Sequence, residues 1–147
     1  MGRVDRIEFF VLGRPVPERR QLVLVKTPEG MKKRMLRTKK AEEWKKKVAA
    51  YALAAVMNAG GRKPLWERGP VALKLQFYFK PTRRMKHWPV PHTKRPDSTN
   101  LVKLCEDALT GIVWADDNQI VHTDCEKWYG LPEGVRITVK FLGGEGE

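Results

Sequence analysis

The sequence has few cysteines and no long hydrophobic run, and each shortage excludes a class of protein. Cys105 and Cys125 are the only cysteines among 147 residues, and they lack the paired spacing of a zinc site, so we expect reduced structural thiols. No stretch approaches the roughly 18 apolar residues of a membrane-spanning helix, and residues 1–5 have no apolar signal region. We therefore expect a cytoplasmic protein with one hydrophobic core.

Acidic residues are also scarce relative to basic ones. The chain has 29 Lys and Arg against 17 Asp and Glu, a formal net charge of +12 at pH 7. Basic side chains neutralise phosphates and release condensed counterions, so this composition favours a polyanionic partner, with nucleic acid as the leading candidate. A membrane surface would also attract the charge, but no segment is suited to span one. Acidic residues that cluster in such a basic chain therefore suggest a specific chemical role, such as binding a divalent cation.

The hydrophobic pattern predicts one α/β (α+β) domain over residues 1–147. Helices are expected from Thr38 to about residue 58 and from Asn100 to about Thr110, and strands are expected at residues 3–12, 71–80, 112–114, 119–128 and 135–141. The first strand is apolar on both parities and should be buried on both faces, whereas residues 71–80 alternate and should be half-buried. The order β-α-β-α-β-β predicts a mixed β-sheet with two main helices and leaves the strand order open.

Three segments lack hydrophobic periodicity. Residues 18–40 are cationic with turn chemistry at 27–30, which predicts a mobile basic arm or hairpin with an electrostatic role. Residues 81–96 form a basic loop, and residues 143–147 form a tail. In the loop we expect DNA-binding cations, with His87 and Trp88 stacking on unpaired bases at a branch. These cations are Arg83, Arg84, Lys86, Lys94 and Arg95. A solvated surface loop is the alternative.

Acids and a lysine are ordered around the second expected helix in a way that suits phosphodiester chemistry. The helix carries the chain roughly 16 Å away from Asp97, and extended residues 111–115 return it by a similar distance. Asp97 should then meet Asp116 and Asp117 beside the helix N-terminus. Such carboxylates could hold one or two Mg²⁺ ions, with Mn²⁺ as an alternative ion, and the metal would activate water for attack. Lys103 would stabilise charge on the phosphorus oxygens.

A simpler interpretation assigns these residues to local structure. Asp97 would then cap the helix, the Asp116–Asn118 segment would form a turn, and Lys103 with Asp107 would be an exposed i, i+4 pair. The order and spacing of the acids and the lysine together favour the catalytic interpretation.

The same residues resemble the RusA family of Holliday junction resolvases, which carry P-D-x-D-N-L-x-K, then D-A-L-N-G, then D-D-x-Q. Here the chain reads Pro96-Asp97-Ser98-Thr99-Asn100-Leu101-Val102-Lys103, then Asp107-Ala108-Leu109-Thr110-Gly111, then Asp116-Asp117-Asn118-Gln119. Lys127 and Gly130 resemble the end of the family pattern, and the Gly-x-Pro-x-Pro run of residues 13–17 resembles the usual turn after its first strand. The resemblance is dense between Arg95 and Gly130.

The resemblance implies a Mg²⁺-dependent homodimer that nicks two strands of a four-way DNA junction symmetrically, in recombination and repair, within a bacterial cell or a phage-infected host. It makes Asp97, Asp116 and Asp117 the metal-site acids and Lys103 the catalytic lysine. A two-fold dimer matches the two equivalent strands to be cut.

One residue departs from the family pattern. Thr99 stands where many members have a second Asp, so one charged ligand is missing, and Asp107 and Asp124 are candidates to replace it. A noncatalytic basic nucleic-acid-binding protein and a nuclease for flaps or other branched DNA are the alternative functions.

Overall fold

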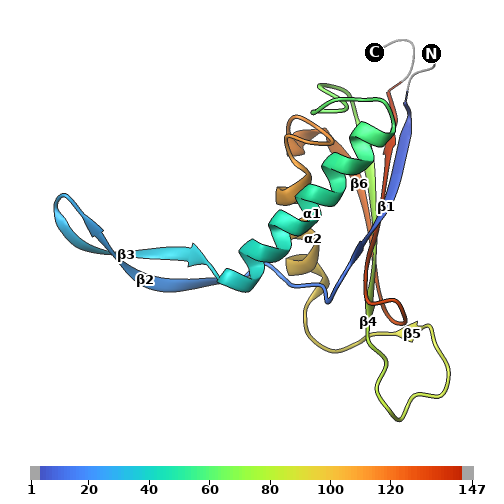
Figure 1. Ribbon diagram of the computed structural model, residues 1–147, viewed down its shortest axis with the longest axis horizontal. Helices are drawn as coiled ribbons and strands as arrows, with labels where there is room; N and C mark the ends of the chain where they lie inside the picture. Colours follow the sequence, from blue (N-terminus) through green and yellow to red (C-terminus); the bar gives the residue numbers. More distant parts are fainter. Residues whose placement is uncertain (1–3, 144–147) are drawn as a thin grey trace.

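A mixed five-stranded sheet forms the body of the protein in the computed structural model, which describes residues 4–143 (Figure 1). Its strands are β1 (Arg6–Leu12), β4 (Val71–Phe79), β5 (Val90–Pro91), β6 (Ile120–Tyr129) and β7 (Gly134–Phe141). The order across the sheet is β1-β7-β4-β6-β5, in which β4 and β6 pair in parallel and the other neighbours pair antiparallel. Arg3 and residues 144–147 of the expected tail lie outside the described residues.

Two helices, α1 (Lys39–Asn58) and α2 (Ser98–Leu109), cover one face of this sheet (Figure 1). The apolar residues at helical spacing in α1 are buried, and the Ala41 N–H donates to the Thr38 side chain, which caps the helix. Every second residue of β4 from Val71 to Phe79 is buried under the helices, while the residues between them are not. These helices and the mixed sheet confirm the expected fold class.

The first strand was predicted to be buried on both faces, and this is wrong. Ile7 and Val11 are buried, but Leu12 is 50% exposed. β1 lies at the edge of the sheet, and its second row of side chains lies on the face without helices. There Phe10 packs against Tyr78 with 6.2 Å between ring centroids, so this apolar side chain contacts a ring on the face without helices, which we call the open face.

The basic segment contains a two-stranded hairpin of β2 (Arg20–Thr27) and β3 (Gly30–Arg37) that projects from the body (Figure 1). Among the described strands, these two pair only with each other. Leu22, Leu24, Met31 and Met35 of the hairpin are each more than half exposed. We call the β2–β3 hairpin the arm. Because these apolar side chains are exposed and the two strands pair only with each other, the tip of the arm is not stabilised by contacts with the hydrophobic core.

The strand expected at residues 112–114 is absent, and a closed turn takes its place. Both the Ile112 and the Val113 N–H donate to the Leu109 carbonyl, at 3.1 and 3.0 Å, and the Gly111 N–H donates to the Trp114 carbonyl at 2.7 Å. Val113 and Trp114 are fully buried, which explains their hydrophobicity without a strand. The chain consequently stays near the C-terminal end of α2.

Cys105 and Cys125 are free thiols, and burial raises the pKa of both, that of Cys125 to about 11. Within residues 4–143, no helix combines the length and the apolar character needed to cross a bilayer.

Leu75→Ala tests the division between core and arm. Leu75 is 0% exposed in the central strand, so its truncation should lower the unfolding free energy by about 3 kcal/mol through lost contacts and a cavity. Leu24→Ala in the arm, where the side chain is 65% exposed, should change it by less than about 0.5 kcal/mol. Urea denaturation measures both values, and comparable losses would show that the apolar side of the arm is covered.

Candidate active site

The N-terminal half of α2 presents the motif residues to solvent. Asp97 precedes the helix, its carboxylate makes no capping hydrogen bond, and Asp97, Thr99 and Lys103 are all exposed. Thr99 and Lys103 are four positions apart and so lie on the same side of the helix. Asp97 thus occupies the N-cap position, as the simpler interpretation expected, but its exposed side chain makes no capping hydrogen bond.

Lys127 fixes the entry to this helix. Its ammonium group donates to the carbonyls of Lys94 and Pro96, each at 2.7 Å, which ties the end of the 81–96 loop to β6. The loop is also anchored by His92, a buried side chain that stacks on Phe79 with 4.3 Å between ring centroids. The cations of the loop nevertheless remain exposed. They are Arg83, Arg84, Lys86, Lys94 and Arg95.

Asp116 and Asp117 have different surroundings. Asp116 caps the short 3₁₀ helix η1 (Asp117–Gln119), where its Oδ1 accepts from the Asn118 N–H at 2.9 Å. Gln119 completes this capping box by accepting from the Asp116 N–H at 2.9 Å. The turn interpretation thus holds for Asp116, whereas the capping box does not use the exposed Asp117 carboxylate.

The acids lie toward opposite ends of α2, which contradicts the expected meeting beside its N-terminus. Glu106 near the helix C-terminus has a raised pKa, first because of burial and then because of the negative charge of Asp117. Asp97 precedes the first turn of this 12-residue helix, which is about 18 Å long. Figure 1 likewise shows the loop after α2 at the far end from the loop that enters it. The closed turn at residues 110–114 does not return the chain as an extended strand would.

No group of three or more His, Cys, Asp or Glu side chains within residues 4–143 could hold a metal ion. The two proposed replacements for the acid missing at Thr99 are both unsuitable. Asp107 is bound to Arg37 at 3.0 Å. Asp124 is the register partner of Lys74, which lies on the sheet face opposite to the helices. The catalytic roles of Asp97, Asp116 and Asp117 stay predictions.

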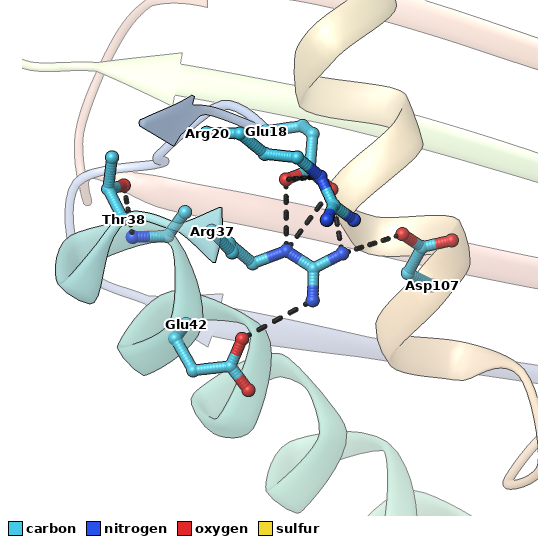
Figure 2. Close-up of polar contacts among 7 residues, drawn as sticks. Glu18, Arg20, Arg37, Thr38, Glu42 and Asp107 are labelled. Atoms are coloured by element: carbon cyan, nitrogen blue, oxygen red, sulfur yellow. Dashed lines mark hydrogen bonds and ion pairs between the residues drawn. The ribbon is translucent and has the colours of Figure 1, made fainter. Parts of the chain in front are cut away.

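A charged cluster centred on Arg37 joins the base of the arm to both helices (Figure 2). The guanidinium group donates to both Glu18 carboxylate oxygens, with Nη2 to Oε2 at 2.8 Å and Nε to Oε1 at 2.9 Å. It also donates to Asp107 of α2 at 3.0 Å and to Glu42 of α1 at 3.3 Å. The Arg37 and Glu18 side chains are only 13% and 6% exposed. The exposed Lys103–Asp107 pair expected from the sequence is therefore not the main contact of Asp107.

Glu18 also brings negative charge to the side of α2 that carries Lys103. Its backbone N–H donates to the Asn100 carbonyl at 2.9 Å. Hydrogen bonds from Arg37 lower the pKa of Glu18, and the charges of Arg37, Arg20 and Lys103 lower it further. Sequence reasoning missed Glu18 and Arg37 because both lie in the segment interpreted as a basic arm. The one available signal was that Glu18 is the only acid between residues 9 and 28.

Glu18→Gln should lower the unfolding free energy by about 3 kcal/mol at pH 7, because Arg37 would lose its buried anionic partner. The folded-state pKa of Glu18 is below its ordinary value of 4.5, so its stabilisation is present above that pH and disappears as the pH falls through the folded value. The difference between wild type and variant should therefore shrink in acid. Urea denaturation at pH 7 and pH 3 measures it.

Glu29→Gln is the control, since Glu29 forms only an exposed pair with Lys32 at 3.8 Å and should contribute almost nothing at either pH. An equal loss for Glu18→Gln at both pH values would show that Glu18 acts through packing rather than charge.

Comparison with known families agrees with the motifs around α2. The family model described as Endodeoxyribonuclease RusA matches residues 13–140, which is most of the chain. No curated protein is significantly similar to the sequence. The matched span includes the arm, both helices and the loop that carries Asp116 and Asp117. The chain therefore belongs to the RusA family of endodeoxyribonucleases, enzymes that act on Holliday junctions.

Proposed function

We propose that this protein is a Mg²⁺-dependent endonuclease that resolves four-way junctions in recombination and repair by paired, symmetric nicks made by a homodimer. The observation that carries the proposal is the exposed face of α2 with Asp97 and Lys103, at the start of which the cationic loop 81–96 is tied down by Lys127. Family membership supports the reaction class. The loop cations supply phosphate contacts close to the motif residues.

Lys103 is the group best placed to act on a phosphate. Lys103 is exposed on the outer side of α2, close enough to Glu18 for its positive charge to lower the pKa of that carboxylate. During attack on phosphorus, negative charge builds on the phosphate oxygens, and a positioned cation lowers the energy of that state. Lys103 therefore serves as an electrophilic helper, and Arg37 keeps the adjacent Glu18 in place.

The metal requirement rests on the family resemblance. The carboxylates of one chain do not fit a site with three acidic ligands, because Asp97 and Asp117 lie toward opposite ends of α2 and Asp116 is engaged in a cap. Mg²⁺, or Mn²⁺ in its place, would supply Lewis acidity and a water of lowered pKa. Asp97, Asp116 and Asp117 remain the acids proposed to serve it.

Lys103→Ala should reduce single-turnover nicking of a synthetic four-way junction by about 100-fold, because it removes charge stabilisation in the transition state. Junction affinity should change by less than about threefold, since one cation contributes little to the total phosphate contact. Lys140→Ala is the control, because Lys140 is an exposed cation of β7 on the open face of the sheet. Equal losses of affinity and rate for Lys103→Ala would refute its proposed role.

Asp97→Asn and Asp117→Asn should each abolish Mg²⁺-dependent nicking while junction binding persists, because each change removes a hard anionic oxygen. Asp124→Asn, on the open face, should nick like wild type. If wild type and Asp117→Asn nick equally, the catalytic assignment is wrong.

The same assay separates the rival functions. If neither wild type nor Asp117→Asn nicks the junction but both bind it with steep salt dependence, the chain is a noncatalytic DNA-binding protein. Parallel reactions on a flap and on a linear duplex distinguish a junction resolvase from a nuclease for other branched DNA.

A further inference from the structure

Residues 60–70, which connect α1 to β4, are bonded closely to the turn that follows α2. The Leu65 and Trp66 N–H groups donate to two carbonyls of that turn, each at 3.0 Å. Trp66 is buried, and its indole N–H donates to the Val4 carbonyl at 2.9 Å. We call residues 60–70 the 60–70 segment. Its backbone is therefore held in place from two sides.

Gln119 ties the same segment to the loop that carries Asp116. Its side-chain oxygen accepts from the Ala115 and Asp116 N–H groups at 2.8 and 2.9 Å. Its side-chain nitrogen donates to the Trp66 and Gly69 carbonyls at 3.2 and 3.1 Å. A carboxamide can accept two hydrogen bonds and donate two, and Gln119 makes all four here. A carboxylate at this position could accept but not donate, so the amide itself is required.

A cavity of about 890 Å³ lies beside the 60–70 segment and is bordered by charged side chains. Arg62, Lys63 and Arg68 line it together with one acid, Glu67, and all four residues are exposed. Within residues 4–143, none of the three cations forms an ion pair. The cavity therefore favours an anion, and a guanidinium group can bind a phosphate through two parallel hydrogen bonds.

This cavity and the 81–96 loop lie at opposite ends of α2. The turn bonded to the 60–70 segment follows the helix C-terminus, whereas the 81–96 loop leads to its N-terminus. Figure 1 shows these two connections at opposite ends of the sheet. The helix is about 18 Å long, which equals about five nucleotides of one DNA strand at roughly 3.4 Å each. A strand that follows the exposed side of α2 past Lys103 therefore reaches both.

We propose that Arg62, Lys63 and Arg68 form a phosphate-binding site for the backbone of one arm of the junction, and that Gln119 is the positioning residue that fixes this site relative to Asp116. The inference rests on the proposed action on four-way junctions and extends the DNA contact to the far end of α2. Because the 60–70 segment is already held by hydrogen bonds, binding orders only the three cationic side chains and so costs little entropy.

The double variant Arg62→Ala/Arg68→Ala tests the phosphate contact. Without divalent ions, it should weaken binding of a synthetic four-way junction by about 10-fold and lower the slope of log affinity against log salt by about 2. Fluorescence anisotropy over a range of salt concentrations measures both. Lys140→Ala, on the open face, is the control and should change neither. An unchanged slope for the double variant would overturn the site.

A hydroxyl-radical footprint locates the contact on the DNA. Wild type should protect the backbone on both sides of the branch, and Arg62→Ala/Arg68→Ala should lose protection on one side only. Loss on both sides, or on neither, would contradict the placement at one end of α2. Millimolar inorganic phosphate at matched ionic strength should not displace the junction. Displacement from wild type but not from the double variant would assign the cavity to free phosphate and overturn the duplex assignment.

Gln119→Met tests the positioning role, because methionine has nearly the same length but makes none of the four hydrogen bonds. It should weaken junction binding by about fivefold, and adding it to Arg62→Ala/Arg68→Ala should weaken binding no further, since both changes remove the same contact. Additive losses would show that Gln119 supports only the fold.

The outcomes separate this site from the proposed function. A wild type that binds through the site but never nicks would reject the proposed function and leave the phosphate contact intact. A wild type that nicks, with a double variant of unchanged affinity, would reject the phosphate contact alone.

Discussion

The guanidinium group of Arg37 is the contact on which the placement of the arm depends. A two-stranded hairpin is marginal in water by itself, and the arm forms no sheet with the body. Arg37 binds carboxylates from the segment before β2, from α1 and from α2, and its planar fork can serve several of them at once. Desolvation makes such a cluster weak as a source of net stability. The cluster instead fixes geometry, because it joins the base of the arm to α1 and to α2.

Much of the fold could be predicted because its pattern is local. The apolar spacing of α1 and the alternation in β4 identify both elements without tertiary information. The run Ile112–Trp114 was misinterpreted because a short apolar segment fits a strand and a buried turn equally well. Its decisive contacts are backbone bonds to Leu109 and a Trp114 indole N–H that donates to the Thr110 hydroxyl at 3.0 Å. The prediction that β1 is buried on both faces was wrong for another reason. Phe10 packs against Tyr78 on the sheet face that no helix covers, so an apolar residue there does not indicate burial in the core.

The candidate site divides in the same way. The relative positions of Asp97 and Lys103 could be predicted from the motif because a helix fixes them over a few residues. The position of Asp117 could not be predicted, because the prediction assumed an extended strand after α2, and a closed turn at residues 110–114 takes the place of that strand. Arg37 and Asp107 are 70 positions apart, so their pairing is invisible in a single sequence. The engagement of Asp107 by Arg37 could not be predicted for that reason.

The distribution of charge connects these observations to the task of the protein. Several acids of this cationic chain are already engaged, Glu18, Glu42 and Asp107 by Arg37 and Glu126 by Lys74 and Gln76. The exposed cations of the 81–96 loop form none of these ion pairs, whereas Arg20 at the base of the arm pairs with Glu18 at 3.9 Å. These segments project from the body in different directions, with α2 between them (Figure 1). A branched polyanion has arms that diverge from one point, so two separated basic segments suit it better than one continuous basic face would. The N-terminal half of α2, which carries Lys103, adjoins both segments, because the Glu18 N–H before the arm donates to the Asn100 carbonyl and the Lys127 ammonium group holds the end of the loop at Pro96.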